Sequence, residues 1–516
     1  MTQPKSRTYR SMQNGLVGLG VYLINLILSF VSRKVYLNYL GTELLGLNTT
    51  AHDLLGFLNL AELGIGTAIA CTLFKPLADK DTETINEIVS LQGWLYRKIA
   101  LIVGAAAIVL MAFFPLIFHK TNLPLGFAYL SFGVFLIGSL LSYFVNYQTI
   151  VISANQKDFK VHGCVSATNV FKTICQICAV IFLPNPYIWW CAIELAFSVL
   201  SSYLLHIIVK KDSPYLNTNI QIGRQLRGKY PEVITKVKQL FVHRISSFVL
   251  NQTGSIIMFA FTSLSMVTLV GNYNAIINSI RNLINAAIGN IGASVGNLLT
   301  ENDKDKTMSV FEELFSIRFF LAALACFGIV KLSSPFVALW LGKEYILGRS
   351  TIILLAISIY ISLTRITVDE YIYAKGLYQD IWAPIVESVL NISASIGLGA
   401  AFGVNGVLAG GIISQFCIVL LWKPYFLFTK GLNEPILKYV WMYSKHIVAF
   451  AVCYALTSII IHHISIDPYD GFLSWATCAG IYALIFGAML YFTLYFTTKG
   501  AKLILFRVLT ILRLTH

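Results

Sequence analysis

Apolar stretches of about 20 residues follow one another along nearly the whole chain. A helix needs roughly 20 apolar residues to cross the hydrocarbon core of a bilayer. Hydrophobic residues make up 57% of the 516 residues and charged residues only 12%, which is about half the charged fraction of a soluble protein. The pattern therefore predicts an all-α, polytopic membrane protein. The net charge of +14 is scattered over short segments, which indicates membrane topology rather than nucleic-acid binding.

We expect about fourteen transmembrane helices, one for each apolar stretch. The expected spans are 15–37, 47–73, 99–118, 125–150, 163–183, 188–208, 240–264, 272–298, 314–335, 350–373, 384–404, 406–428, 446–466 and 472–496. Lysine and arginine concentrate in every second loop and in both tails. Cytoplasmic loops carry such an excess of basic residues, so both termini are expected in the cytoplasm.

An internal repeat relates the two halves of the chain. At an offset of 224 residues, "ADKDTET" at Ala78–Thr84 aligns with "NDKDKTM" at Asn302–Met308, and further on "ANQKD" at Ala154–Asp158 aligns with "GLYQD" at Gly376–Asp380 with the offset drifted to 222. An offset that spans six helices preserves orientation, so the halves are expected to be parallel repeats.

The repeat suggests four regions. They are an N-lobe with the first six spans (1–209), a basic cytoplasmic linker (210–239), a C-lobe with the next six spans (240–430), and a C-terminal helix pair with a basic tail (431–516).

Polar side chains recur at helical spacing within several of the expected spans. The asparagines among them are Asn25, Asn48, Asn59, Asn251, Asn278, Asn285 and Asn391. Such residues avoid lipid and face the bundle interior or water. They predict the polar lining of a shared hydrated cavity. The alternative is that they are hydrogen-bonding contacts between helices, which is equally common for Asn and Ser in membrane helices.

Ionisable residues within the spans carry a stronger signal, because an arginine at the centre of a membrane helix costs roughly 2.5–3.5 kcal/mol on insertion scales. The cations are Arg281, Arg365, Lys172 and Arg318, with Arg33 near an outer helix end. The acids are Asp53, Glu62, Asp369 and Glu387. The cations are candidates for binding an anionic substrate, and the acids for ion coupling or for charge pairing with the cations.

No catalytic constellation is present. The sequence lacks a Walker A motif, HExxH and Gly-x-Ser-x-Gly, and its loops are too short to hold a soluble domain. We therefore expect a carrier rather than an enzyme, with no cofactor, no metal site and no catalytic residues.

The block "RKVYLNYLGTELLGLNTTAHDLLGFLNLAELGIGTAIACTLFKPLADKD" at Arg33–Asp81 resembles the first helix pair of bacterial oligosaccharide and polysaccharide (O-antigen type) flippases. These belong to the multidrug/oligosaccharidyl-lipid/polysaccharide exporter (MOP) superfamily. The most characteristic parts are "LGTELLGL", "AELGIGTAI" and "KPLADKD". The resemblance implies two six-helix lobes like those of multidrug-and-toxin extruders (MATE transporters), two additional C-terminal helices, and a place in the bacterial inner membrane.

The resemblance also implies a function. The substrate would be an undecaprenyl-pyrophosphate-linked oligosaccharide, carried across the inner membrane by alternating access for surface polysaccharide synthesis, with a glycan polymerase and other assembly proteins as partners. The family's cationic cavity would be supplied here by Arg281, Arg365, Lys172, Arg33 and Arg318. Two alternatives stay open: an organic-cation efflux transporter of the same fold, and a non-transporting membrane subunit of a glycan-assembly complex.

Overall fold

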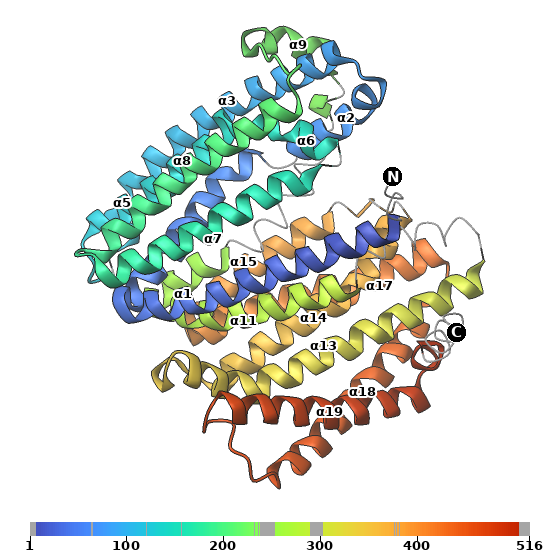
Figure 1. The fold of residues 1–516 in the computed structure, drawn as a ribbon. Coiled ribbons are helices and arrows are strands. Elements are labelled where there is room, and N and C mark those ends of the chain that lie inside the picture. The colour runs from blue at the N-terminus through green and yellow to red at the C-terminus, as the bar shows by residue number, and fades with distance from the viewer. Residues whose placement is uncertain are drawn as a thin grey trace, which may run out of the picture. The chain divides into compact units, whose positions relative to one another are not determined.

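The computed structural model describes residues 7–504 except 63–64, 120, 156, 232, 236, 238–252, 289–302, 376, 378 and 381. Side chains are described for these residues except in 7–23, 60–61, 67–68, 71 and 286–287. Every regular element within the described ranges is helical, as the sequence predicted (Figure 1). Ten of these helices are long and apolar enough to cross a membrane. The count of fourteen spans stays a prediction, because 240–264 and 272–298 lie partly outside the described residues.

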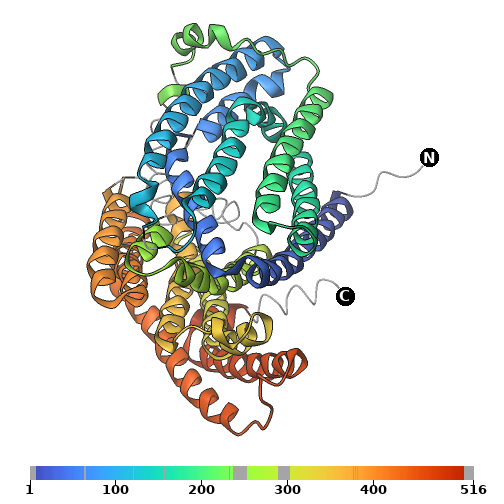
Figure 2. The ribbon, with the colours of Figure 1, turned by 90° about the vertical axis from the view of Figure 1, so that its left-hand side faces the viewer.

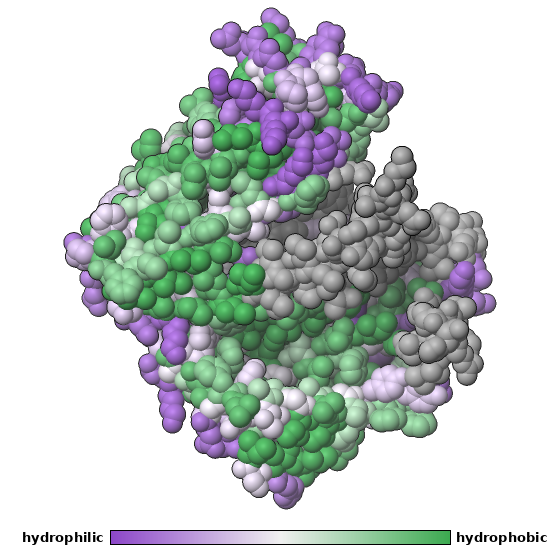
Figure 3. Space-filling view, viewed as in Figure 1, coloured by the Kyte–Doolittle hydropathy of each residue, from purple (hydrophilic) through white to green (hydrophobic). Residues whose placement is uncertain are grey.

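Large apolar side chains point outward from these helices. Phe182, Leu473 and Leu484 are 78%, 83% and 74% exposed, a degree of exposure that lipid tails tolerate and water does not. Figure 3 shows the same pattern as a hydrophobic surface over the helices, whereas the segment around α9 (Gly223–Lys229) at the top is hydrophilic. The chain is a multi-pass membrane protein.

The chain divides into two compact units, Met1–Thr268 and Leu269–His516. The division falls within α11 (Leu264–Ile288) rather than in the expected linker at 210–239. The four regions expected from the sequence therefore stay predictions.

Unit 1 begins with α1 (Arg7–Leu58), which changes direction at Gly41. The φ of Gly41 is +79°, a conformation that glycine adopts without a steric penalty. After this bend the expected span 47–73 is not continuous. It is interrupted by the 3₁₀ turn η1 (Asn59–Glu62), and α2 (Ile65–Asp79) follows. The expectation of one unbroken helix was wrong, because polar residues of the turn are held by hydrogen bonds from neighbouring helices.

Four long helices form the rest of unit 1 (Figures 1 and 2). They are α3 (Thr82–Ala112), α5 (Leu125–Phe144), α7 (Asp158–Phe182) and α8 (Pro186–Asp212). The short elements between them are α4 (Phe114–Ile117), η2 (Asn146–Thr149) and α6 (Ile150–Ala154). Helix α3 packs against α5, α5 against α8, and α7 against α8.

Unit 2 repeats this order of neighbours. Its corresponding helices are α13 (Lys304–Trp340), α14 (Arg349–Ala374), α15 (Trp382–Phe402) and α16 (Val404–Gln415), with η4 (Lys343–Tyr345) between the first two. Helix α13 packs against α14, α14 against α16, and α15 against α16. The shared pattern is what an internal repeat predicts.

The helix caps fix the register of the repeat. Asp81 accepts a hydrogen bond from the Thr84 N–H at the start of α3 (3.0 Å), and Asp303 accepts one from the Lys306 N–H at the start of α13 (2.9 Å). These two N-caps are 303 − 81 = 222 residues apart. The offset of 224 expected at this point was therefore wrong by two residues, because the cap geometry and not the letter match aligns the helices.

The C-terminal part of unit 2 continues from α16 through two π-helical segments. The elements are η5 (Phe416–Trp422), α17 (Lys423–Phe426), η6 (Leu427–Leu432), α18 (Ile436–His462) and α19 (Phe472–Thr497). Helices α18 and α19 pack on each other and on α13. They are the C-terminal helix pair expected from the sequence.

The segment expected to be a linker lies on α3 in its described part. The short turn η3 (Ile220–Ile222) and α9 both contact α3, and the Asn219 N–H donates to Ser90 Oγ (2.9 Å). Gly223 lies so close to α3 that a Cβ on it would overlap the side chain of Trp94. This part of the segment is therefore an ordered cover on unit 1.

Small residues at every fourth position bring α16 onto α15. Gly406, Gly410 and Ser414 are buried on one face of α16, and a Cβ on Gly410 would overlap the backbone of Ser395. Small-xxx-small spacing lets membrane helices approach until their backbones touch. The spacing is readable in the sequence.

We expect Gly410→Ala to destabilise unit 2, because the added methyl meets backbone that cannot rotate away; overpacking of this kind costs about 1–3 kcal/mol. Gly397→Ala on α15 is the matched control, since nothing lies within 4 Å of a Cβ there. The midpoint of thermal unfolding in detergent should fall for the first variant only. Equal midpoints would show that the contact is not tight.

Candidate functional site

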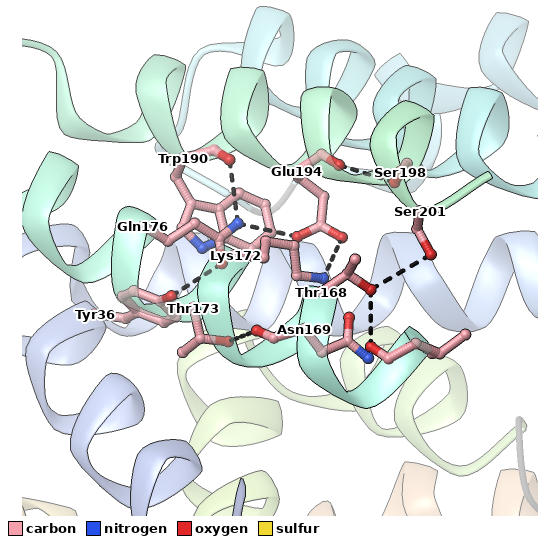
Figure 4. A network of polar contacts seen from close by, with 11 residues as sticks. Tyr36, Thr168, Asn169, Lys172, Thr173, Gln176, Trp190, Glu194, Ser198 and Ser201 are labelled. Atoms are coloured by element: carbon pink, nitrogen blue, oxygen red, sulfur yellow. Dashed lines mark hydrogen bonds and ion pairs between the residues drawn. The ribbon is translucent and has the colours of Figure 1, made fainter. Parts of the chain in front are cut away.

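Lys172 and Glu194 form an ion pair between α7 and α8. The Lys172 ammonium lies 2.8 Å from Glu194 Oε1, and Gln176 Nε2 donates to the other carboxylate oxygen at 2.9 Å (Figure 4). Gln176 also donates to the Trp190 carbonyl (3.2 Å) and accepts from the Tyr36 hydroxyl of α1 (3.1 Å). Three helices of unit 1 thus meet in one polar network at membrane depth.

This network borders a hollow of about 290 Å³. Its wall carries further hydroxyl groups, including those of Thr168, Ser198 and Ser201, as well as Asn169 (Figure 4). The hollow can hold water or a small polar group, but its one described cation, Lys172, has its charge matched by Glu194. Sequence reasoning missed Glu194, although a lone acid within the apolar stretch 188–208 is a readable signal.

A network of four charges lies in unit 2. Arg365 Nε is 2.8 Å from Asp369 Oδ2, Lys423 Nζ is 2.7 Å from Asp369 Oδ1, and Arg365 Nη1 is 3.7 Å from Glu387 Oε1. Glu387 is only 3% exposed and Lys423 11%. Two cations and two carboxylates balance, so this tetrad is electrically neutral.

Lys423 was not predicted as a member of this site. It follows directly after the π-helical segment η5, whose wider turn differs from the α-helix assumed for the span 406–428. Such π segments are rare and frequently occur at functional sites. The changed winding rotates the residues beyond it, which an α-helical projection of the sequence does not reproduce.

Arg318 is also paired. Its Nη2 lies 2.7 Å from Glu370 Oε1, between α13 and α14, and the arginine side chain is 4% exposed. The remaining guanidinium nitrogens Nε and Nη1 have no hydrogen-bond partner. Because this pair is buried in the core of unit 2, it stabilises the fold and lies where a substrate does not reach it.

Arg281 differs from these three cations. On α11 its Nη1 donates to Asn278 Oδ1 of the preceding turn (3.2 Å), and its Nε has no hydrogen-bond partner. Among the residues that the structure describes, no carboxylate lies within ion-pair distance of Arg281. Arg33 of α1 donates a hydrogen bond from Nη2 to the Thr268 carbonyl oxygen at 3.4 Å.

The other polar residues expected to line a cavity mostly serve as contacts between helices. Asn48 accepts from the Tyr187 hydroxyl (2.7 Å), and Asn391 Nδ2 lies 3.4 Å from Ser414 Oγ. Asn59 accepts from Ser139 (3.0 Å) and from Tyr143 (2.8 Å), which holds the 3₁₀ turn in place.

The remaining expected residues lie in varied surroundings. Asn25 is half-buried and Asn285 is exposed, and Asn251 lies outside the described residues. Asp53 Oδ1 lies 3.9 Å from His52 Nδ1. Glu62 accepts from the Tyr96 hydroxyl (3.1 Å), and within the described ranges it has no cation within ion-pair distance.

The expected ionisable site residues therefore fall into groups that differ in their charge partners. The structure joins Arg365, Asp369 and Glu387, pairs Lys172 and Arg318 with acids that were not predicted, and leaves Arg281 without an acid in the described part of the chain. The shared cavity predicted from the sequence draws on residues of both units and stays a prediction. In the described ranges no group of His, Cys, Asp and Glu could hold a metal ion.

We expect Glu194→Gln to weaken unit 1, because the ammonium of Lys172 then lies within the membrane span without a counter-charge. The two side chains are 21% and 15% exposed, so the loss should stay below the ~3–5 kcal/mol that removal of one partner from a fully buried pair costs. Lys172→Met combined with Glu194→Gln should recover most of the loss. The measurement is the thermal unfolding midpoint in detergent. An unchanged midpoint for Glu194→Gln would mean that water already solvates Lys172.

No protein-family model and no curated protein sequence matches the chain. Solved structures do match. A structure of the lipid II flippase MurJ in an inward closed conformation superimposes with a TM-score of 0.63 and 15% identity, covering 93% of this chain and 99% of that one. An inward-facing multidrug resistance MATE family transporter of the MOP superfamily superimposes with a TM-score of 0.57 and 14% identity, covering 81% and 99%. The chain thus has the fold that MurJ and this MATE transporter share.

Proposed function

We propose that the chain is a flippase that carries a polyprenyl-pyrophosphate-linked oligosaccharide from the cytoplasmic to the periplasmic leaflet of a bacterial inner membrane. The observation that carries this proposal is Arg281, an arginine on α11 within the expected span 272–298, whose described surroundings hold no acid to neutralise it. The fold shared with a lipid II flippase and the resemblance of Arg33–Asp81 to polysaccharide flippases support the same function.

A pyrophosphate group needs cationic partners to pass through a bilayer. A guanidinium binds phosphate oxygens bidentately and keeps its charge under all physiological conditions. Lys172, Arg365 and Arg318 are ion-paired, so they offer no net charge to the substrate. Arg281 therefore takes the central role, and Arg33 of α1 is a second candidate contact.

The mechanism is alternating access. The headgroup enters from the cytoplasmic leaflet while the polyprenyl chain stays in lipid, and rocking of the two repeats then opens the site to the periplasm. Asn285, which is exposed on the same helix as Arg281, can offer hydrogen bonds that tolerate different sugars.

Ion coupling is assigned to Glu62. Asp369 and Glu387 lie in a charge network with Arg365 and Lys423. The described hydrogen-bond partner of Glu62 is instead a neutral tyrosine hydroxyl. A buried carboxyl group without a counter-charge is the kind that takes up and releases protons. Glu62→Gln is expected to uncouple transport from the proton gradient.

The test is deletion of the gene in its host, followed by measurement of lipid-linked oligosaccharide on the cytoplasmic leaflet and of glycan at the cell surface. Accumulation inside together with loss outside is the expected result. Unchanged glycan with new sensitivity to cationic dyes would overturn the proposal in favour of organic-cation efflux. Unchanged transport with loss of assembled glycan would indicate a non-transporting subunit of an assembly complex.

A further inference from the structure

A basic hollow of about 340 Å³ lies in unit 2, where α18 begins and α19 ends. Four lysines line it, two on α18 and two on the helical turn 499–504 that follows α19: Lys438, Lys445, Lys499 and Lys502. Among the described residues that line it, Glu312 of α13 is the single carboxylate. Lys438 is also ion-paired with Glu434 at 3.4 Å. Lys445, Lys499 and Lys502 outnumber Glu312, so the hollow carries a net positive charge.

The backbone holds two of these lysines over the hollow. A Cβ on Gly500 would overlap the Glu312 carbonyl, and Ala501 is buried against unit 2. The turn after α19 thus rests directly on α13. This contact fixes Lys499 and Lys502, one on each side of the glycine–alanine pair, instead of leaving them on a free tail.

The rim of the hollow is apolar and aromatic. Trp441 and Phe496 are 65% and 73% exposed beside the ammonium groups, and Lys445 Nζ lies 5.1 Å from the centre of the Trp441 ring. Tryptophan occurs in membrane proteins at headgroup depth, where one side of the ring meets lipid. A cationic centre with a lipid-facing aromatic rim fits an amphiphilic anion, whereas a free phosphate ion would use the centre alone.

We propose that this hollow binds the phosphate headgroup of an anionic membrane phospholipid in the leaflet where α18 begins, which the charge distribution predicts to be cytoplasmic. Basic hollows between helices at this depth recognise phospholipid headgroups by charge. The acyl chains would lie along α18 and α19. The proposal is independent of what the protein transports.

The test titrates the purified full-length protein in detergent with cardiolipin and counts bound lipid by native mass spectrometry. We expect K499Q/K502Q to bind roughly tenfold more weakly. The matched control is K210Q/K211Q, which removes two exposed lysines from the end of α8 in unit 1 and should bind like the wild type. If K499Q/K502Q does not fold, Lys445→Gln provides the same test.

Three results would overturn the proposal. Equal weakening in the pocket and control variants would mean nonspecific attraction to basic residues. Preference for polyprenyl pyrophosphate over cardiolipin would make the hollow a substrate site. Saturable binding of inorganic phosphate that cardiolipin does not displace would show that the lipid-facing rim plays no part.

Discussion

Replacing Arg281 with glutamine is expected to lower transport about tenfold to hundredfold, because a hydrogen bond to a charged group contributes about 1.5–3 kcal/mol. Arg281→Lys should fall between the wild type and this variant, since lysine keeps the charge but loses the two-pronged geometry of the guanidinium. The measurement is the rate at which lipid-linked oligosaccharide reaches the outer leaflet of vesicles that contain the purified protein.

The folded state should tolerate the change well. Arg281 has one described side-chain hydrogen bond, to Asn278 within its own helix, and its insertion into a bilayer is itself unfavourable. Arg281→Gln is therefore expected to leave the unfolding midpoint unchanged or to raise it. Loss of transport without loss of stability would identify a substrate contact rather than a structural one.

The control is Arg349→Gln, which removes an exposed arginine at the start of α14. It should transport at the wild-type rate. Normal transport by both Arg281→Gln and Arg281→Lys would rule out Arg281 as the pyrophosphate contact, and with it the observation on which the proposed function rests.

The sequence predicted the fold far better than it predicted the site. Apolar stretches locate membrane helices because each helix satisfies its own backbone hydrogen bonds, so length and hydrophobicity suffice. The break at Asn59–Glu62 escaped this reasoning, since its composition remains apolar enough for a span. Its cause lies in Ser139 and Tyr143, which belong to a helix that is remote in sequence.

Charge pairing was the least predictable feature, because partners come from different helices. Glu194 lies 22 residues from Lys172, Glu370 lies 52 from Arg318, and Lys423 lies 54 from Asp369. Among the described ion pairs of the expected site residues, only Arg365 and Asp369, four residues apart on α14, showed their proximity in the sequence. Counting cations within the spans therefore overstated the positive charge that a substrate would meet.

Disruption of the tetrad is expected to have the largest effect on stability. Asp369 bridges Arg365 and Lys423. Asp369→Asn therefore leaves two cations within the membrane-spanning helices, with Glu387 as the one remaining carboxylate of the tetrad. Removal of one partner from a buried ionic network costs about 3–5 kcal/mol. We expect low yield and a clearly lower unfolding midpoint in detergent. Glu434→Gln, which breaks the more exposed pair with Lys438 (3.4 Å), should cost less than about 1 kcal/mol.

A double variant separates charge balance from shape. Asp369→Asn with Lys423→Gln restores neutrality, since Arg365 and Glu387 remain as a pair, and it should recover much of the lost stability. If the double variant is no more stable than Asp369→Asn, hydrogen-bond geometry rather than charge holds the tetrad together. If Asp369→Asn unfolds at the wild-type midpoint, water reaches these side chains. In the wild type the other three charges of the tetrad neutralise Arg365. Access of water would make Arg365 available to an anionic substrate in addition to Arg281.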